Sequence, residues 1–123
     1  MENFRLLLID DEEELVSTLV ERLDMRGIEA EYAMSGIAAL KLLEQKKFDV
    51  VLLDYKLPGM SGLLVMEEIN KRYPQIKVLL ITGAGGPEEE ITRFIELRSG
   101  EVLLKPIDIE VLIETVKKSL KEK

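Results

Sequence analysis

Blocks of apolar residues alternate with amphipathic stretches along the whole chain. Continuous runs of branched apolar residues predict strands that are buried on both faces of a sheet. Five strands are predicted, at Phe4–Ile9, Ile28–Ala33, Asp49–Leu53, Ile76–Ile81 and Glu101–Leu104. The second has a weaker, alternating pattern, so we place it near a sheet edge.

Apolar residues at helical spacing follow each predicted strand and predict a helix there. These five helices cover Glu12–Met25, Ser35–Lys46, Leu63–Arg72, Pro87–Arg98 and Asp108–Leu120. Ser35 and Asp108 can cap the second and the last helix, because their side chains can accept hydrogen bonds from the first turn. Gly27 and Pro74 end the first and the third helix.

Five alternations of strand and helix predict an α/β fold with a parallel sheet and helices on both faces. Right-handed crossovers restrict the topology to a few choices. The sequence contains no obvious linker, repeat or low-complexity segment, so we expect one domain over residues 1–123.

Composition and charge exclude several classes of function. The formal net charge is −7, and the basic residues are dispersed except in the tail after Lys117, which suits a helix C-terminus. We therefore expect no direct binding to nucleic acid, which depends on neutralising phosphates. The chain has no cysteine, no stretch like a signal peptide and no apolar run that could span a bilayer, so we expect a cytoplasmic protein without membrane contact.

The chain also has no histidine. This excludes histidine-based nucleophile triads, histidine-ligated metal sites and a phosphohistidine on this chain.

Polar residues stand at the carboxyl ends of four of the five predicted strands. They are Asp10, Asp11, Asp54, Thr82 and Lys105. In a parallel sheet these ends meet at one edge, where ligands of open α/β sheets bind. Taken singly, the acids can be helix caps or turn residues, Thr82 an ordinary strand end and Lys105 a solvated lysine. Their joint occurrence favours one site.

The residue types in this group indicate phosphoryl chemistry. Three converging carboxylates repel one another unless a hard cation such as Mg²⁺ joins them, and Mg²⁺ binds carboxylates, waters and phosphate oxygens. A carboxylate can attack phosphorus to form an aspartyl phosphate. The Lys105 ammonium can neutralise charge in that reaction, and the Thr82 hydroxyl can donate a hydrogen bond to a phosphoryl oxygen.

The chain resembles the receiver domain of two-component response regulators over essentially its whole length. The motifs that carry the resemblance are Asp10-Asp11, Asp54 followed by Pro58-Gly59-Met60 and Gly62, Thr82, and Lys105-Pro106. The resemblance implies a flavodoxin-like fold with strand order 2-1-3-4-5 and a cis Lys105–Pro106 bond.

The resemblance also implies a function. Asp54 would accept a phosphoryl group from a phosphohistidine of a sensor histidine kinase or a histidine phosphotransferase. Asp10, Asp11, Asp54 and the backbone carbonyl of Lys56 would hold Mg²⁺, while Thr82 and Lys105 would contact the phosphoryl group. The domain would be no enzyme beyond its own phosphorylation and dephosphorylation.

The expected output face consists of the helix at 88–98, the strand at 101–104 and the helix at 108–120. It would serve a downstream effector protein or an effector domain absent from this chain. Two positions depart from the family pattern: Val102 stands where receivers usually have an aromatic residue, and Gly83 stands where alanine is more common.

Two other functions compete with this interpretation. Val102 gives weight to a phosphorylation-independent binding module on the same fold. A flavin-binding or hydrolytic enzyme is disfavoured, because the acidic loop 10–14 would repel a phosphate that lacks a bridging metal. Glu12 has the spacing from Asp10 that a phosphatase general acid needs, but the chain has no cap insertion.

Overall fold

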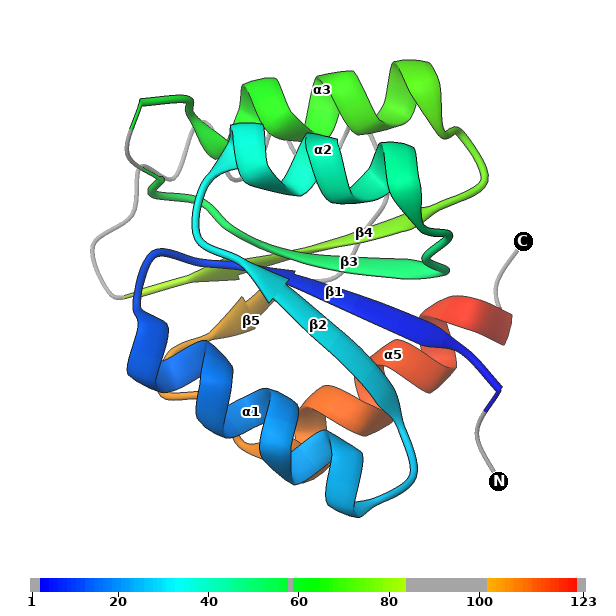
Figure 1. The fold of residues 1–123 in the computed structure, drawn as a ribbon. Helices are drawn as coiled ribbons and strands as arrows, with labels where there is room; N and C mark the ends of the chain where they lie inside the picture. The colour runs from blue at the N-terminus through cyan, green and yellow to red at the C-terminus, as the bar shows by residue number, and fades with distance from the viewer. Residues whose placement is uncertain (1–2, 58, 84–101, 122–123) are drawn as a thin grey trace.

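The computed structural model describes residues 3–57, 59–83 and 102–121 and contains a single parallel sheet (Figure 1). Its strands are β1 (Arg5–Ile9), β2 (Glu29–Ala33), β3 (Val50–Asp54), β4 (Lys77–Thr82) and β5 (Val102–Leu104). Their order is β2-β1-β3-β4-β5, and all neighbours pair in parallel. The predicted fold class and strand order are therefore confirmed, as is the edge position of β2.

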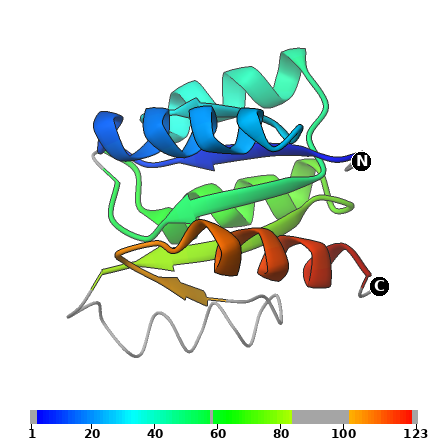
Figure 2. The same cartoon turned by 90° about the horizontal axis from the view of Figure 1, so that it is seen from below.

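Helices cover both faces of this sheet. They are α1 (Glu13–Met25), α2 (Gly36–Gln45), α3 (Gly62–Arg72) and α5 (Ile109–Lys121). Figures 1 and 2 show α1 and α5 on one face and α2 and α3 on the other. The helix predicted at 87–98 and the glycine-rich loop before it, apart from Gly83, lie outside the described residues. Among the residues that the structure does describe, no helix combines the length and the apolar character needed to cross a membrane.

The strand sequences explain why the sheet has helices on both sides. Side chains along a strand point alternately to opposite faces. Leu6 and Leu8 of β1 pack in the core layer of α1 and α5, whereas Leu7 and Ile9 pack in the layer of α2 and α3. All four are fully buried, and β3 repeats the pattern. A strand with two buried faces needs a continuous apolar run, which is what the sequence shows.

Local signals set most helix ends. The Ser35 Oγ accepts a hydrogen bond from the Ala38 N–H at 3.1 Å, and Asp108 Oδ1 accepts one from the Glu110 N–H at 2.8 Å, so both predicted caps are confirmed. Gly27 has a φ of 76° after α1, in the left-handed region that glycine tolerates. Ser61 is an N-cap that the sequence analysis missed, and α3 begins one residue earlier than predicted.

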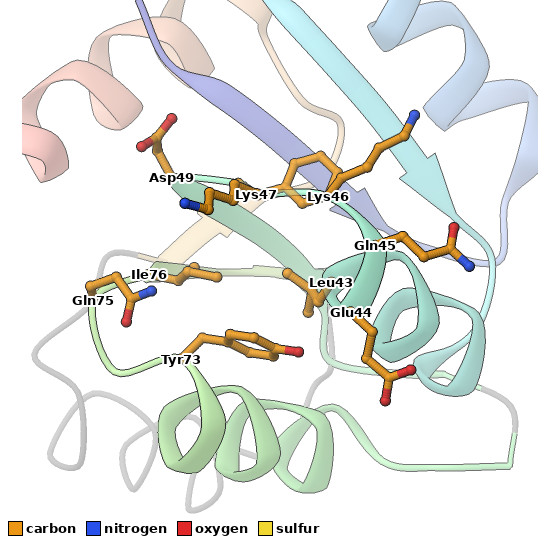
Figure 3. A pocket seen from close by; sticks show the side chains of 10 residues that line it. Leu43, Glu44, Gln45, Lys46, Lys47, Asp49, Tyr73, Gln75 and Ile76 are labelled. Atoms are coloured by element: carbon orange, nitrogen blue, oxygen red, sulfur yellow. The ribbon is translucent and has the colours of Figure 1, made fainter.

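A pocket of about 460 Å³ lies at the amino ends of β3 and β4, next to the C-terminal ends of α2 and α3 (Figure 3). Leu43 and Ile76 form part of its apolar wall. Lys46 on its rim pairs with Glu31 at 3.0 Å. The pocket is at the opposite end of the sheet from Asp54, so it does not coincide with the predicted site.

Gly62 fixes the loop between β3 and α3 against the end of β3. Its N–H donates to the Tyr55 carbonyl at 3.1 Å. A Cβ at this position would lie 2.8 Å from the Tyr55 carbonyl oxygen and 2.9 Å from that of Asp54. These neighbours are backbone atoms, so relieving such contacts requires a shift of the chain that carries Asp54.

We expect Gly62→Ala to lower the free energy of unfolding by about 1–3 kcal/mol, the range for overpacking in a tightly packed site. Urea denaturation followed by circular dichroism measures this change. Gly83→Ala is the matched control, because an added Cβ there meets nothing within 4 Å. Equal stability of the two variants would contradict the packing role of Gly62.

Candidate functional site

Two buried carboxylates end adjacent strands. Asp10 directly follows β1 and Asp54 is the last residue of β3, which pairs with β1 in the register Ile9↔Leu53. Only 1% of Asp10 and 5% of Asp54 are exposed. The parallel sheet therefore brings these two predicted acids to the same edge, as the sequence analysis expected.

The two carboxylates are held in the same way. Asp10 Oδ1 accepts a hydrogen bond from the Glu12 N–H at 2.9 Å, and Asp54 Oδ1 accepts one from the Lys56 N–H at 3.1 Å. A hydrogen bond from an Asp side chain to the backbone two residues on is typical of Asp at the start of a turn. In both residues the loop thus fixes Oδ1 and leaves Oδ2 for another partner.

That partner is the Lys105 ammonium. Lys105 Nζ lies 3.0 Å from Asp10 Oδ2 and 3.1 Å from Asp54 Oδ2, and it also pairs with Glu12 Oε1. Lys105 follows β5, and its backbone N–H donates to the Thr82 carbonyl at 2.9 Å. The Lys105–Pro106 bond is cis, as the resemblance implied.

The carboxylate cluster has the donor set of a hard-cation site. Carboxylate oxygens of Asp10, Glu12 and Asp54 lie within 4.8 Å of one another. Asp10 Oδ2 is buried, and its contact in the structure is with a cation, the Lys105 ammonium at 3.0 Å. Mg²⁺ prefers oxygen ligands of this kind, so the cluster fits that ion.

Burial and charge act in opposite directions on the two central groups. Burial raises the pKa of Asp10, and the nearby Asp54 charge adds to this effect, outweighing hydrogen bonds from the Glu12 N–H and Lys105. Burial alone would lower the pKa of Lys105, but hydrogen bonds to Glu12, Asp10 and Asp54 raise it well above its ordinary value. Lys105 is therefore a cation at neutral pH and serves as the counter-ion of the cluster.

The remaining predicted site residues lie around this cluster. Asp11 is exposed and is not one of the three acids whose oxygens converge. With Tyr55, Lys56 and Ser61 it lines a pocket of about 420 Å³ beside Asp54. Thr82 ends β4, is only 3% exposed, and donates its hydroxyl hydrogen to the Gly83 carbonyl at 3.2 Å.

Glu12 is the member of the cluster that the sequence analysis did not assign to this site. It was considered only as a general acid for a phosphatase. The sequence feature that points to Glu12 as a member of the site is its position two residues after Asp10, immediately before α1 begins at Glu13. That signal is ambiguous in the sequence, because three glutamates follow Asp11.

Comparison with known proteins places the chain in a family. Residues 6–117 match the model of the response regulator receiver domain, so the chain belongs to the receiver domain family.

Among curated relatives, it is 32% identical to sporulation initiation phosphotransferase F of Bacillus subtilis, covering 98% of this chain and 96% of that protein. It is 28% identical to the uncharacterized transcriptional regulatory protein YkoG of the same species, covering 99% of this chain but 53% of the relative.

Solved structures agree with this assignment. A CheY-like receiver domain protein from Methanospirillum hungatei has a TM-score of 0.87 and 27% identity, covering 98% of this chain and 96% of that one. NtrX from Brucella abortus has a TM-score of 0.88 and 26% identity, but this chain covers only 27% of its length. The chain thus spans about half or a quarter of several relatives it matches, and nearly all of others.

The family defines the kind of function. Receiver domains are phosphoacceptor signalling domains of two-component systems, not classical enzymes, and the family binds Mg²⁺ at an acidic pocket. The predicted family and signalling role are confirmed. No comparison supports the alternative of a phosphorylation-independent binding module.

We expect Asp10→Asn to raise the free energy of unfolding without divalent cations, and to abolish the stabilisation that Mg²⁺ gives the wild-type chain. Because the folded-state pKa of Asp10 is raised, the fold favours the protonated carboxyl, and the stability that this group contributes is fully present below its unfolded-state pKa. It is lost as the pH rises through the folded pKa, so the ionised side chain destabilises the fold at neutral pH.

Thermal denaturation with and without Mg²⁺ tests this expectation. Asp24→Asn is the matched control, since it removes the same charge from an exposed position on α1. A stabilising effect of Mg²⁺ on the Asp10→Asn chain as large as on the wild type would contradict the role of Asp10 in the cation site.

Proposed function

We propose that residues 1–123 form one receiver domain in which Asp54 is the phosphoacceptor. The observation that carries this proposal is the convergence of Asp10, Glu12 and Lys105 on the Asp54 carboxylate. A buried carboxylate with an ammonium at 3.1 Å and a cation site beside it has what a nucleophile for phosphoryl transfer needs.

In the proposed reaction an Asp54 oxygen attacks the phosphorus of a phosphohistidine. The new O–P bond forms as the N–P bond breaks, and the electron pair of that bond stays on the imidazole nitrogen, which then takes a proton. The donor is a separate protein, a sensor histidine kinase or a histidine phosphotransferase, because this chain has no histidine. The Lys56 N–H, which holds Asp54 Oδ1 at 3.1 Å, orients the carboxylate for the attack.

Mg²⁺, when bound, would neutralise charge on the phosphoryl oxygens. Asp10, Asp54 and Asp11 would hold it, together with the backbone carbonyl of Lys56. The buried Asp10 Oδ2, which now faces only the Lys105 cation at 3.0 Å among the described residues, supports this assignment, and so does the pocket that Asp11 and Lys56 line together.

Lys105 and Thr82 would report the new charge to the rest of the domain. The phosphoryl group brings negative oxygens to which the Lys105 ammonium can pair. The Thr82 hydroxyl can exchange its bond to the Gly83 carbonyl for one to a phosphoryl oxygen. Both changes occur where β4 and β5 end, and they would shift the population of conformations there.

The proposed output face includes β5 and α5. Leu104 is 67% exposed and Val111 is 49% exposed, so this part of the surface offers apolar side chains to an effector protein or an effector domain. The helix at 88–98, which the proposal also includes, lies outside the described residues. A cytoplasmic location, without membrane or nucleic-acid binding by this domain, remains part of the proposal.

Incubation with Mg²⁺ and a small acyl phosphate donor should add the mass of one phosphoryl group to the wild-type chain. Asp54→Asn should show no added mass, because the amide is a far weaker nucleophile than a carboxylate. Intact-protein mass spectrometry measures both, with Asp24→Asn as a control that keeps the site intact. A phosphoryl adduct on the Asp54→Asn chain would show that the acceptor lies elsewhere.

A further inference from the structure

The Lys105 ammonium occupies the centre of the carboxylate cluster. Its three N–H donors face three carboxylates: Asp10 Oδ2 at 3.0 Å, Asp54 Oδ2 at 3.1 Å, and Glu12 Oε1. Only 19% of the Lys105 side chain is exposed. The Lys105 ammonium is therefore a counter-ion of all three carboxylates.

Lys105 and a divalent cation need the same oxygen atoms. Oδ1 of Asp10 and Oδ1 of Asp54 each accept a backbone N–H, so Oδ2 is the oxygen of each residue that no backbone donor holds in these hydrogen bonds and that faces the cation. Mg²⁺ binds its ligands at about 2.0–2.1 Å, which is too close to leave an ammonium on the same oxygens without strong repulsion between like charges. A divalent cation that binds these oxygens therefore competes with Lys105 for both aspartates.

Glu12 differs from the two aspartates in ways that suit it to receive the lysine. Its side chain is 59% exposed, whereas that of Asp10 is 1% and that of Asp54 is 7%. Glu12 lies at the rim of the cluster and directly precedes α1. Its side chain makes no capping hydrogen bond to that helix. A carboxylate at the rim can keep Lys105 paired while the buried aspartates bind the metal.

We propose that Glu12 is a positioning residue that holds Lys105 at the rim when Mg²⁺ takes Asp10 and Asp54. This inference rests on the proposed function, because it assumes that Mg²⁺ binds at this cluster. Glu12 lowers the cost of cation exchange: without it, Lys105 would lose the carboxylate partners that the described residues provide when the metal binds. The pair also keeps the ammonium near Asp54, where the phosphoryl group arrives.

A double-mutant cycle on Mg²⁺ affinity tests the proposal. The dissociation constant is measured by isothermal titration calorimetry at fixed pH and ionic strength for the wild type, Glu12→Gln, Lys105→Met and the double variant. Glu13→Gln is the matched control, because it removes the same charge from the neighbouring exposed residue. Circular dichroism checks that each variant folds, and Lys105→Gln replaces Lys105→Met if the latter does not.

We expect Lys105→Met to bind Mg²⁺ more tightly, since the competing cation is gone. Glu12→Gln should weaken binding by about two- to fivefold, the scale of a partly exposed ion pair, and Glu13→Gln should have a smaller effect. In the Lys105→Met background, the loss caused by Glu12→Gln should fall to less than about 1.5-fold, because the two residues act through each other.

Two results would overturn the inference while leaving the proposed function intact. An equal or larger effect of Glu12→Gln in the Lys105→Met background would mean that Glu12 binds the metal directly. No effect of Glu12→Gln in either background would mean that its contact with Lys105 does not matter for metal binding. Failure of the wild-type chain to bind Mg²⁺ would instead overturn the metal site on which the proposed function depends.

Discussion

The need to balance two buried carboxylates at one edge of the sheet governs the arrangement of the site. Asp10 and Asp54 end adjacent strands, and ionised carboxylates removed from water require a partner of opposite charge. The order β2-β1-β3-β4-β5 places β4 between these strands and β5, where the lysine is anchored. Lys105 reaches both acids because its side chain is long enough to cross the end of β4. Its backbone N–H also contacts β4, where it donates to the Thr82 carbonyl.

The rest of the fold compensates for the burial of the Asp10 charge. Burial raises the pKa of Asp10, so the ionised group opposes folding at neutral pH. The compensation comes from two apolar layers, one on each face of the sheet. Such layers are the main favourable contribution to folding. The carboxylates of the cluster fit a hard cation, and the stability of the site depends on the core beneath it.

Sequence patterns predicted the fold well because most of them report local or periodic constraints. Strand β3 has two buried faces, which requires a continuous run of apolar residues. Ser35 and Gly27 have direct roles at helix ends. The direction of a single side chain in a loop is harder to predict. Asp11 and Glu12 are consecutive acids, and only the path of the chain into α1 decides that the oxygens of Glu12 join the cluster and those of Asp11 do not.

Strand β5 has Val102 at the position where receiver domains usually have an aromatic residue, which bears on how phosphorylation could change the output face. Leu103 packs in the layer of α1 and α5, whereas Val102 packs against the layer of α2 and α3. A branched aliphatic side chain has few rotamers and no ring to turn inward. Under the proposed function, the charge at Asp54 would reach β5 through Lys105, while Thr82 would respond at the end of β4. The hydrogen bond of 2.9 Å between the Lys105 N–H and the Thr82 carbonyl joins the two residues that would contact the phosphoryl group, and it ties the ends of β4 and β5 together at the site.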